Sequence, residues 1–238
     1  MKGDLLKELN LSRSEGRPTA IVTRLDSGDQ WRIDETSDSG APGEMALLAR
    51  AALAEDRSHV VSFEGSDLFI HVHNPPLRLV VVGAVHIAQA LSLMATRVGY
   101  GVTVIDPRGA FATEERFPGI DISNEWPDEA LGRMRLDSRT AVVTLTHDPK
   151  LDDAALQVAL SSDAFYIGSL GSKKTHQARL NRLERLGFDR KACSRIHGPI
   201  GLAIGAKSPA EIAVATLAEI TQVRHTLTQP VSSVGATK

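Results

Sequence analysis

Apolar residues between positions 77 and 225 follow two alternating patterns. Short continuous runs rich in Val, Ile and Leu are typical of strands buried on both faces of a parallel sheet, and they occur at 79–82, 102–105, 140–146 and 164–167. Between these runs, apolar residues recur three or four positions apart, as on the buried face of a helix. This alternation predicts an α/β fold, a Rossmann-like parallel sheet with helices on both faces. In the loop after the second run, Phe111 and Phe117 are expected to point inward.

The first third of the chain has a different pattern. It contains an amphipathic helix at 44–55, strands at 19–25, 59–63 and 68–72, a polar helix or arm at 1–16 and a polar loop at 26–43. We therefore predict a small α+β N-terminal module over 1–73. Asn74-Pro75-Pro76 interrupts any regular element and is the predicted linker to the Rossmann-like domain at 77–226. Residues 227–238 are predicted to be a disordered tail.

Composition and charge narrow the class of protein. The 238 residues are 42% hydrophobic and 24% charged, as in ordinary globular proteins, and the formal net charge of −2 gives no reason to expect a nucleic-acid partner. No apolar run reaches the length of a membrane span, and the first residues contain no apolar export signal. One cysteine cannot form an intrachain disulfide, so we expect a cytoplasmic protein without a membrane partner.

Residues 77–108 have the order of a dinucleotide-binding unit. A strand, a Gly-containing turn, a helix and a second strand follow one another, and the second strand ends at Asp106, 23 positions after Gly83. In such units the turn offers backbone amides to a pyrophosphate and the acid binds the ribose hydroxyls. Val85 stands where the fingerprint has its second glycine, and its side chain obstructs the pyrophosphate. Two interpretations remain open, a dinucleotide site or a Rossmann-type scaffold without a tight one.

Four stretches with chemical potential follow predicted strands, at 83–86, 106–108, 146–148 and 168–174. Ligands of open parallel sheets bind at the carboxyl ends of the strands, so these stretches predict a site there. At 168–174, the amides of a helix start and two lysines suit an anion; the alternative is a Gly-rich turn with solvated lysines. Asp106 with Arg108 suits a ribose with or without a 2′-phosphate, and the alternative is an acid that caps its own loop.

Three further groups of residues carry reactive side chains. His147 and Asp148 form a candidate acid–base pair, although adjacent residues at a strand end point apart. Cys193 lies near basic residues that could lower the pKa of its thiol; the alternative is a small packed residue. His71 and His73 share one face of a strand, but no third ligand accompanies them, so we interpret them as surface histidines rather than a metal site.

Five segments carry a resemblance to a known family, in order over about 77–222: GAVHIAQAL, VIDPRGAFATEERFP, RTAVVTLTHDPKLDDAAL, AFYIGSLGSKKTHQARL and IHGPIGLAIGAKSPAEIAVATLAEI. They resemble the XdhC/CoxI family, the accessory proteins of xanthine dehydrogenase and CO dehydrogenase maturation. Several motifs in order are far more specific than one glycine pattern. The resemblance implies a Rossmann-like C-terminal domain and a role in delivering the molybdenum cofactor.

The resemblance also implies a cargo and partners. Members of the family bind the molybdenum cofactor (molybdopterin), protect it while a cysteine desulfurase exchanges its terminal oxo ligand for sulfur, and assist its insertion. We therefore expect two partners, the molybdenum-binding subunit of a xanthine dehydrogenase-type enzyme and a cysteine desulfurase, and we expect a homodimer. Some members bind FAD or NADP in this domain, which leaves both as further ligands.

The strand-end loops that match the family contain the predicted cofactor-binding residues. They are Gly83, Ala84, Val85, His86, Ile87, Asp106, Pro107, Arg108, Thr146, His147, Asp148, Gly168, Ser169, Leu170, Gly171, Ser172 and Lys173. We predict no catalytic residue and no metal ligand. Many members have Gly where Val85 stands, and longer members have a Ser-Gly-Gly-Cys segment. Residues 1–76 contain no cysteine, so no contact of that segment is transferred to this chain.

Three functions of different classes remain in competition. The first is a non-enzymatic chaperone of the molybdenum cofactor that assists its sulfuration and insertion. The alternatives are an NAD(P)- or FAD-binding oxidoreductase of the same fold, and a regulatory module that senses a nucleotide. Val85 and the lack of a convincing catalytic set favour the chaperone.

Overall fold

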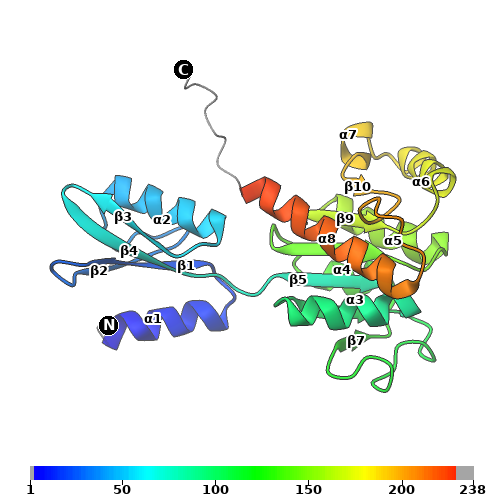
Figure 1. Ribbon diagram of the computed structural model, residues 1–238, viewed down its shortest axis with the longest axis horizontal. Helices are drawn as coiled ribbons and strands as arrows, with labels where there is room; N and C mark the ends of the chain where they lie inside the picture. The colour runs from blue at the N-terminus through cyan, green and yellow to red at the C-terminus, as the bar shows by residue number, and fades with distance from the viewer. Residues whose placement is uncertain (1–2, 229–238) are drawn as a thin grey trace. The chain divides into compact units, whose positions relative to one another are not determined.

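The computed structural model describes residues 3–228 of the chain (Figure 1). The chain divides into two compact units, and the division falls between Pro75 and Pro76. Each unit has its own sheet and its own hydrophobic core. No helix in the described residues is long and apolar enough to cross a membrane.

Residues 3–75 form an antiparallel four-stranded sheet with strand order β2-β1-β4-β3 and two helices. The elements are α1 Gly3–Ser14, β1 Thr19–Arg24, β2 Gln30–Ile33, α2 Gly43–Glu55, β3 His59–Phe63 and β4 Ser66–His73. The apolar face of α2 packs on the sheet through Met45, Ala46 and Ala49. This arrangement confirms the small α+β module.

Strand β2 lies inside the segment that we predicted to be a loop, so that prediction was wrong. The strand has only four residues, and only Ile33 is fully buried, which leaves little periodicity to detect. It forms because β1 offers a free edge, against which Ala20 pairs with Ile33 and Thr23 with Gln30.

Within residues 76–227 the chain forms a parallel sheet of six strands in the order β10-β9-β8-β5-β6-β7, which confirms the predicted Rossmann-like class. The strands are β5 Arg78–Val82, β6 Gly101–Ile105, β7 Asp121–Ser123, β8 Thr140–Thr144, β9 Tyr166–Ser169 and β10 Ile196–His197. The helices are α3 His86–Arg97, α4 Pro127–Arg133, α5 Pro149–Leu160, α6 Lys173–Arg185, α7 Arg190–Cys193 and α8 Pro209–Thr228.

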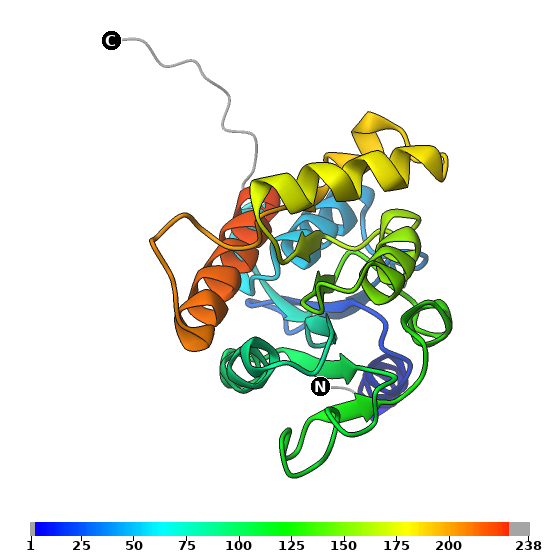
Figure 2. The same ribbon diagram turned by 90° about the vertical axis from the view of Figure 1, so that its right-hand side faces the viewer.

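Helices cover both faces of this sheet, as Figure 2 shows. One face packs against α3 and α8 through residues such as Leu91 and Ile220. The other face packs against α4, α5 and α6, with Leu131, Leu156 and Leu183 in its core. Burial of each such leucine stabilises the fold by roughly 1.5–3 kcal/mol.

Three details of the second unit differ from the predictions. The short elements β7 and α7 were not predicted, because three or four residues carry no periodic signal. Phe117 is buried as expected, but Phe111 is 44% exposed, so its inward position was wrong. Helix α8 includes Leu227 and Thr228, which we assigned to the tail; residues 229–238 of that predicted tail lie outside the described residues.

Candidate site at the carboxyl edge of the parallel sheet

The strand order places the predicted loops at one edge of the sheet. All six strands are parallel, so the segments after β5, β6, β8 and β9 emerge at the same side. Strand β5 lies between β6 and β8, and the direction of the connections reverses there. A parallel sheet leaves a crevice for ligands at such a reversal.

The turn after β5 lies directly against the loop after β8. Gly83 has φ +108°, and a Cβ at this position would be 2.5 Å from Cγ2 of Thr146. A side chain is therefore excluded by sterics and by the backbone conformation. Gly83 is required for this close approach of the two segments.

Asp106 is buried, and its carboxylate accepts hydrogen bonds from neighbouring protein groups. Its Oδ2 accepts hydrogen bonds from the Ala84 backbone N–H at 2.8 Å and from Arg108 Nη2 at 2.8 Å, and its Oδ1 accepts from Arg108 Nε at 2.9 Å. Burial alone would raise the pKa of Asp106, but these hydrogen bonds outweigh it and hold the pKa below its usual range. The carboxylate thus caps its own loop and the β5 turn, and ribose hydroxyls would have to displace these bonds.

Helix α3 begins in this crevice without a side-chain cap. Its N-cap is Val85, in an extended conformation with ψ 175°, and Val85 has no oxygen to accept an amide hydrogen. Val85 and Ile87 are half-buried against the core, whereas His86 is exposed. The first turn of α3 therefore keeps backbone donors, and the positive end of its dipole, without a side-chain partner.

The polar side chains of Thr146 and Asp148, in the loop after β8, form hydrogen bonds to neighbouring protein groups. Thr146 Oγ1 donates to Asp152 Oδ1 at 2.6 Å and accepts from the Asp148 backbone N–H at 3.0 Å. Asp148 Oδ1 accepts from Lys150 N at 2.9 Å and so caps α5. His147 is exposed in the left-handed region, with φ +63°. Asp148 is thus directed at its helix and not at His147, which gives the proposed acid–base pair no support.

Gly168 and Ser169 lie inside strand β9 and are buried. A Cβ on Gly168 would be 2.6 Å from Cδ1 of Ile200, and Ser169 Oγ is hydrogen-bonded to Thr144 Oγ1 at 2.5 Å. Packing explains both residues without a ligand. We expected them among the ligand-binding positions because the strand end was placed too early.

Helix α6 supplies its own cap. Ser172 Oγ accepts from the Thr175 backbone N–H at 3.1 Å. Gly171 precedes it with φ +145°, and Lys173 and Lys174 are exposed. An anion at this helix start would compete with the serine hydroxyl for an amide.

A buried ion pair that the sequence analysis missed lies beneath this loop. Arg179 is 1% exposed, and its Nη2 donates to the Leu170 carbonyl at 2.8 Å and lies 3.8 Å from Asp152 Oδ2. Arg179 Nε and Nη1, Asp152 Oδ2 and His176 Nδ1 have no hydrogen-bond partner among the described residues. Burial lowers the pKa of Arg179 and raises that of Asp152. One signal was available, since Arg179 precedes the core residue Leu183 by one helical turn.

A second network joins the end of β10 to α8. Glu219 Oε2 accepts from Tyr166 Oη at 2.5 Å and from the Gly201 backbone N–H at 2.9 Å, and Oε1 lies 3.3 Å from His197 Nδ1. Burial opposes ionisation, but the hydrogen bonds from His197, Tyr166 and Gly201 hold the pKa of Glu219 below its usual range. This network fixes α8 on the sheet.

The other reactive residues lie apart from this edge. Cys193 is 3% exposed, and burial raises the pKa of its thiol, as expected of a packed residue. The rings of His71 and His73 are 4.0 Å apart, and no group of three or more potential metal ligands occurs in residues 3–228.

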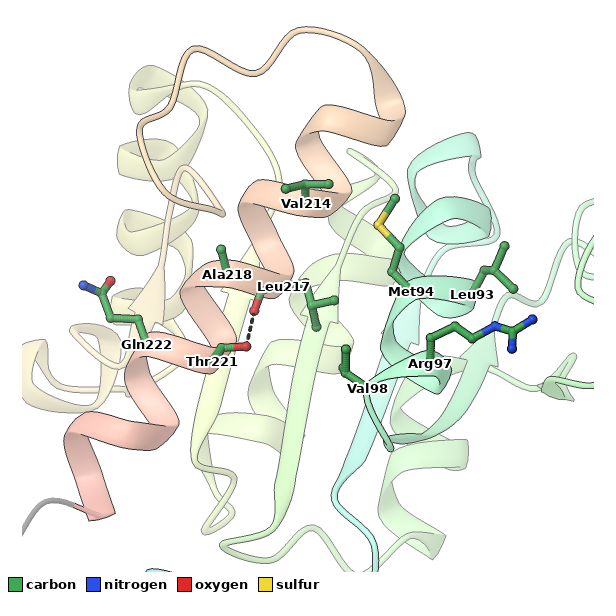
Figure 3. Close-up of a pocket in the computed structure, with 9 residues that line it drawn as sticks. All are labelled: Leu93, Met94, Arg97, Val98, Val214, Leu217, Ala218, Thr221 and Gln222. Atoms are coloured by element: carbon green, nitrogen blue, oxygen red, sulfur yellow. Dashed lines mark hydrogen bonds between the residues drawn. The ribbon is translucent and has the colours of Figure 1, made fainter.

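Two hollows flank α3 on the outside of the second unit. The larger, of about 820 Å³, lies between α3 and α8 and is mostly apolar (Figure 3). The smaller, of about 310 Å³, lies between α3 and the segment before β7. It is lined by Gln89, Ala90, Ser92, Leu93, Arg116, Phe117, Pro118 and Ile120.

Known proteins are similar to this chain in sequence. Residues 79–220 match the XdhC Rossmann domain. A Bacillus subtilis (strain 168) protein named as a probable xanthine dehydrogenase component is 33% identical over 88% of this chain and 62% of its own length. The Escherichia coli (strain K12) "Molybdenum cofactor insertion chaperone PaoD" is 32% identical over 63% of this chain and 41% of its own length. The chain therefore spans less than two thirds of either relative.

A solved structure shares the fold. The crystal structure of a Bacillus halodurans protein described as a xanthine dehydrogenase superposes with a TM-score of 0.73. It has 24% sequence identity, and the match covers 97% of this chain and 66% of the other. At this identity the likeness concerns the fold alone.

Proposed function

The chain belongs to the XdhC family, and from this membership we propose that it binds the molybdenum cofactor and assists its insertion into a xanthine dehydrogenase-type molybdoenzyme. A relative that carries the name of a molybdenum cofactor insertion chaperone supports this proposal. The structural observation that carries it is the uncapped start of α3 in the crevice beside Arg108.

The chemistry of this crevice suits the anionic part of the cofactor. Molybdopterin carries a phosphate, and a helix start without a side-chain cap binds anions through its backbone amides and dipole. Arg108 adds a guanidinium whose side chain is 40% exposed although it is bonded to Asp106. Charge-assisted hydrogen bonds of this kind contribute about 1.5–3 kcal/mol each.

The same residues argue against a dinucleotide-dependent oxidoreductase. The Ala84 amide, which would face a pyrophosphate, donates to Asp106 instead, and Val85 stands where a glycine would let the pyrophosphate approach the backbone. In the loop after β8, the Thr146 hydroxyl and the Asp148 carboxylate are both engaged in internal hydrogen bonds. These contacts favour a carrier over a catalyst.

The sulfuration step needs a sulfur donor outside this chain. Its one cysteine, Cys193, is buried with a raised thiol pKa, which is unsuited to carrying a persulfide. We therefore include a cysteine desulfurase among the partners of this proposal. The homodimer stays a prediction.

Purification from cells that synthesise the cofactor tests the proposal. We expect molybdenum and an oxidised pterin of characteristic fluorescence to copurify with the chain, and the loaded protein to activate a cofactor-free xanthine dehydrogenase-type enzyme. An absorbance spectrum of the same sample detects a flavin. Bound FAD or submicromolar affinity for NAD(P), with no pterin, would instead favour the oxidoreductase.

A further inference from the structure

The smaller hollow beside α3 has the composition of a small-molecule site. Its walls are mainly apolar, formed by residues such as Leu93, Phe117 and Ile120, and its polar groups come from Gln89, Ser92 and Arg116. Concave apolar walls with a few placed polar groups are typical of ligand pockets. At about 310 Å³ the hollow is near the small end of the range for such pockets.

A polar atom in this wall has no partner. Ser92 is 1% exposed, and its hydroxyl oxygen makes no hydrogen bond in residues 3–228. The backbone carbonyl of the same residue accepts a hydrogen bond from the Thr96 hydroxyl at 2.9 Å, so only the side chain of Ser92 is without a partner in the described part of the chain. A buried hydroxyl without a partner costs free energy unless a water or a ligand supplies one.

The segment after β6 holds a cation at this hollow. Arg116 Nη2 donates to Gln89 Oε1 at 3.3 Å, and Nη1 donates to the Phe111 carbonyl at 2.5 Å. Its Cζ lies 5.7 Å from the ring centre of Phe117, which lines the hollow. Arg116 is thus held by two hydrogen bonds and lines the apolar hollow.

Phe111 connects this opening to the crevice. Arg108 Cζ lies 4.7 Å and Arg116 Cζ 5.9 Å from its ring centre, and the ring is 44% exposed. Arg108 in turn binds Asp106, which holds the β5 turn. The two guanidinium groups therefore lie around one exposed aromatic ring, Arg116 on the side of the hollow and Arg108 on the side of the β5 turn that precedes α3.

We propose that this hollow binds the planar fused heterocycle of a phosphate-bearing ligand, a pterin or a purine. The ring lies against the apolar wall, and rotation of the buried Ser92 side chain brings its Oγ within hydrogen-bond reach of an edge atom of the ring. The phosphates extend from Arg116 to Arg108 and to the start of α3. This inference rests on the proposed function, because it places the heterocycle of the cargo in the hollow. A flat ring needs an apolar slot, which this hollow supplies, and its phosphates need cations nearby, which Arg116 in the wall and Arg108 across the Phe111 ring supply.

Three probes separate the ring from the phosphates: dihydroneopterin triphosphate, GTP and inorganic triphosphate, each titrated calorimetrically into the full chain. We expect at least one ring-bearing probe to bind about tenfold more tightly than triphosphate alone. The tighter of the two identifies a pterin or a purine. Equal affinity for all three probes, or no measurable binding, would overturn the proposal.

Two variants and one control locate the binding. Ala90→Leu fills the hollow and should abolish the advantage of the ring-bearing probe, while Ala218→Leu makes the same change in the groove between α3 and α8 and should leave it unchanged (Figure 3). Ser92→Ala removes an unpartnered hydroxyl, so the fold should be no less stable, yet ring binding should weaken about threefold. Unchanged ring affinity in both Ala90→Leu and Ser92→Ala contradicts this location.

The cofactor itself separates this inference from the proposed function. Normal molybdenum and pterin retention in Ala90→Leu would refute the hollow as the cargo site and leave the chaperone intact. Ring probes that depend on Ala90 and Ser92, in a protein that never retains molybdenum, would refute the chaperone and leave the hollow as a nucleotide or pterin site.

Discussion

Helices α3 and α6 both begin at the carboxyl edge of the parallel sheet, yet they satisfy their first amides differently. Ser172 caps α6 through its hydroxyl, whereas Val85 at the start of α3 offers no acceptor. A side-chain cap contributes about 1 kcal/mol, which a bound anion must match before it displaces the cap. We therefore expect the start of α3, with its more hydrophobic N-cap residue, to be the better anion site, although the Gly-Ser-Lys sequence at α6 looks more suitable.

The largest effect is expected at the turn that precedes α3. Gly83→Ala forces a Cβ to within 2.5 Å of Thr146 Cγ2 at φ +108°, so it should lower the free energy of unfolding by about 3 kcal/mol and abolish cofactor retention. Urea denaturation measures the change. Gly109→Ala is the control, because nothing lies within 4 Å of a Cβ there. Equal free energies of unfolding for the two variants would show that the turn accommodates a Cβ, which contradicts the prediction.

A cap on α3 should remove the difference between the two helix starts. Val85→Ser places a hydroxyl acceptor at the N-cap, so the free energy of unfolding should change by at most about 1 kcal/mol and cofactor retention should fall roughly tenfold. Molybdenum content and pterin fluorescence of the purified variant measure retention. If Val85→Ser retains the cofactor normally, the amides of α3 are not its anion site. Val85→Gly should instead raise any affinity for NAD(P), because it removes the side chain that obstructs a pyrophosphate.

The reverse change at α6 should affect stability and not binding. Ser172→Ala removes a cap that accepts from Thr175 N at 3.1 Å, so the fold should lose about 1 kcal/mol while cofactor retention changes less than twofold. Lys173→Ala, which keeps the cap, is the matched control for stability. A tenfold loss of retention in either variant would return the anion site to α6.

The last prediction concerns the pH dependence of stability. Because the pKa of Asp106 is lowered in the fold, its stabilisation is fully present above its unfolded value of about 4 and is lost as the pH falls through the lower folded value. Asp106→Asn should therefore be less stable than the parent above pH 4, and the difference should shrink below it. Asp163→Asn, at an exposed site, is the control in acid denaturation followed by circular dichroism. A difference that stays constant with pH contradicts this role of Asp106.

The sequence was sufficient for the elements that bury continuous apolar runs. Strands β5, β6 and β8 were predicted because each is a run of buried aliphatic residues, and parallel pairing then brings their ends to one edge. Strand β2 was missed because it depends on the edge of β1 for its formation. Local patterns cannot report such a partner.

Whether a residue at the site is free to bind a ligand depends on contacts with residues that are distant in sequence. Gly168 is small because Ile200 lies against it, and Asp106 is occupied because the turn at Ala84 presents an amide. Neither contact can be inferred from the spacing of residues within one loop. The sequence therefore located the edge of the sheet but not which of its groups remain available to a ligand.

Two adjacent ion pairs connect two of the loops that form the crevice. Asp152 and Asp153 of α5 face Arg179 and Arg182 of α6, with 3.8 Å in the buried pair and two hydrogen bonds from Arg182 to Asp153 in the other. The loops after β8 and β9 are thereby coupled into one rigid wall, while the loop after β6 is bonded to α3 through Arg116 and Gln89. If the proposed cargo binds in the crevice, we expect its release to separate these two sets of loops, while the hydrogen bond from the Ala84 backbone N–H to Asp106 holds the loop after β6 to the β5 turn.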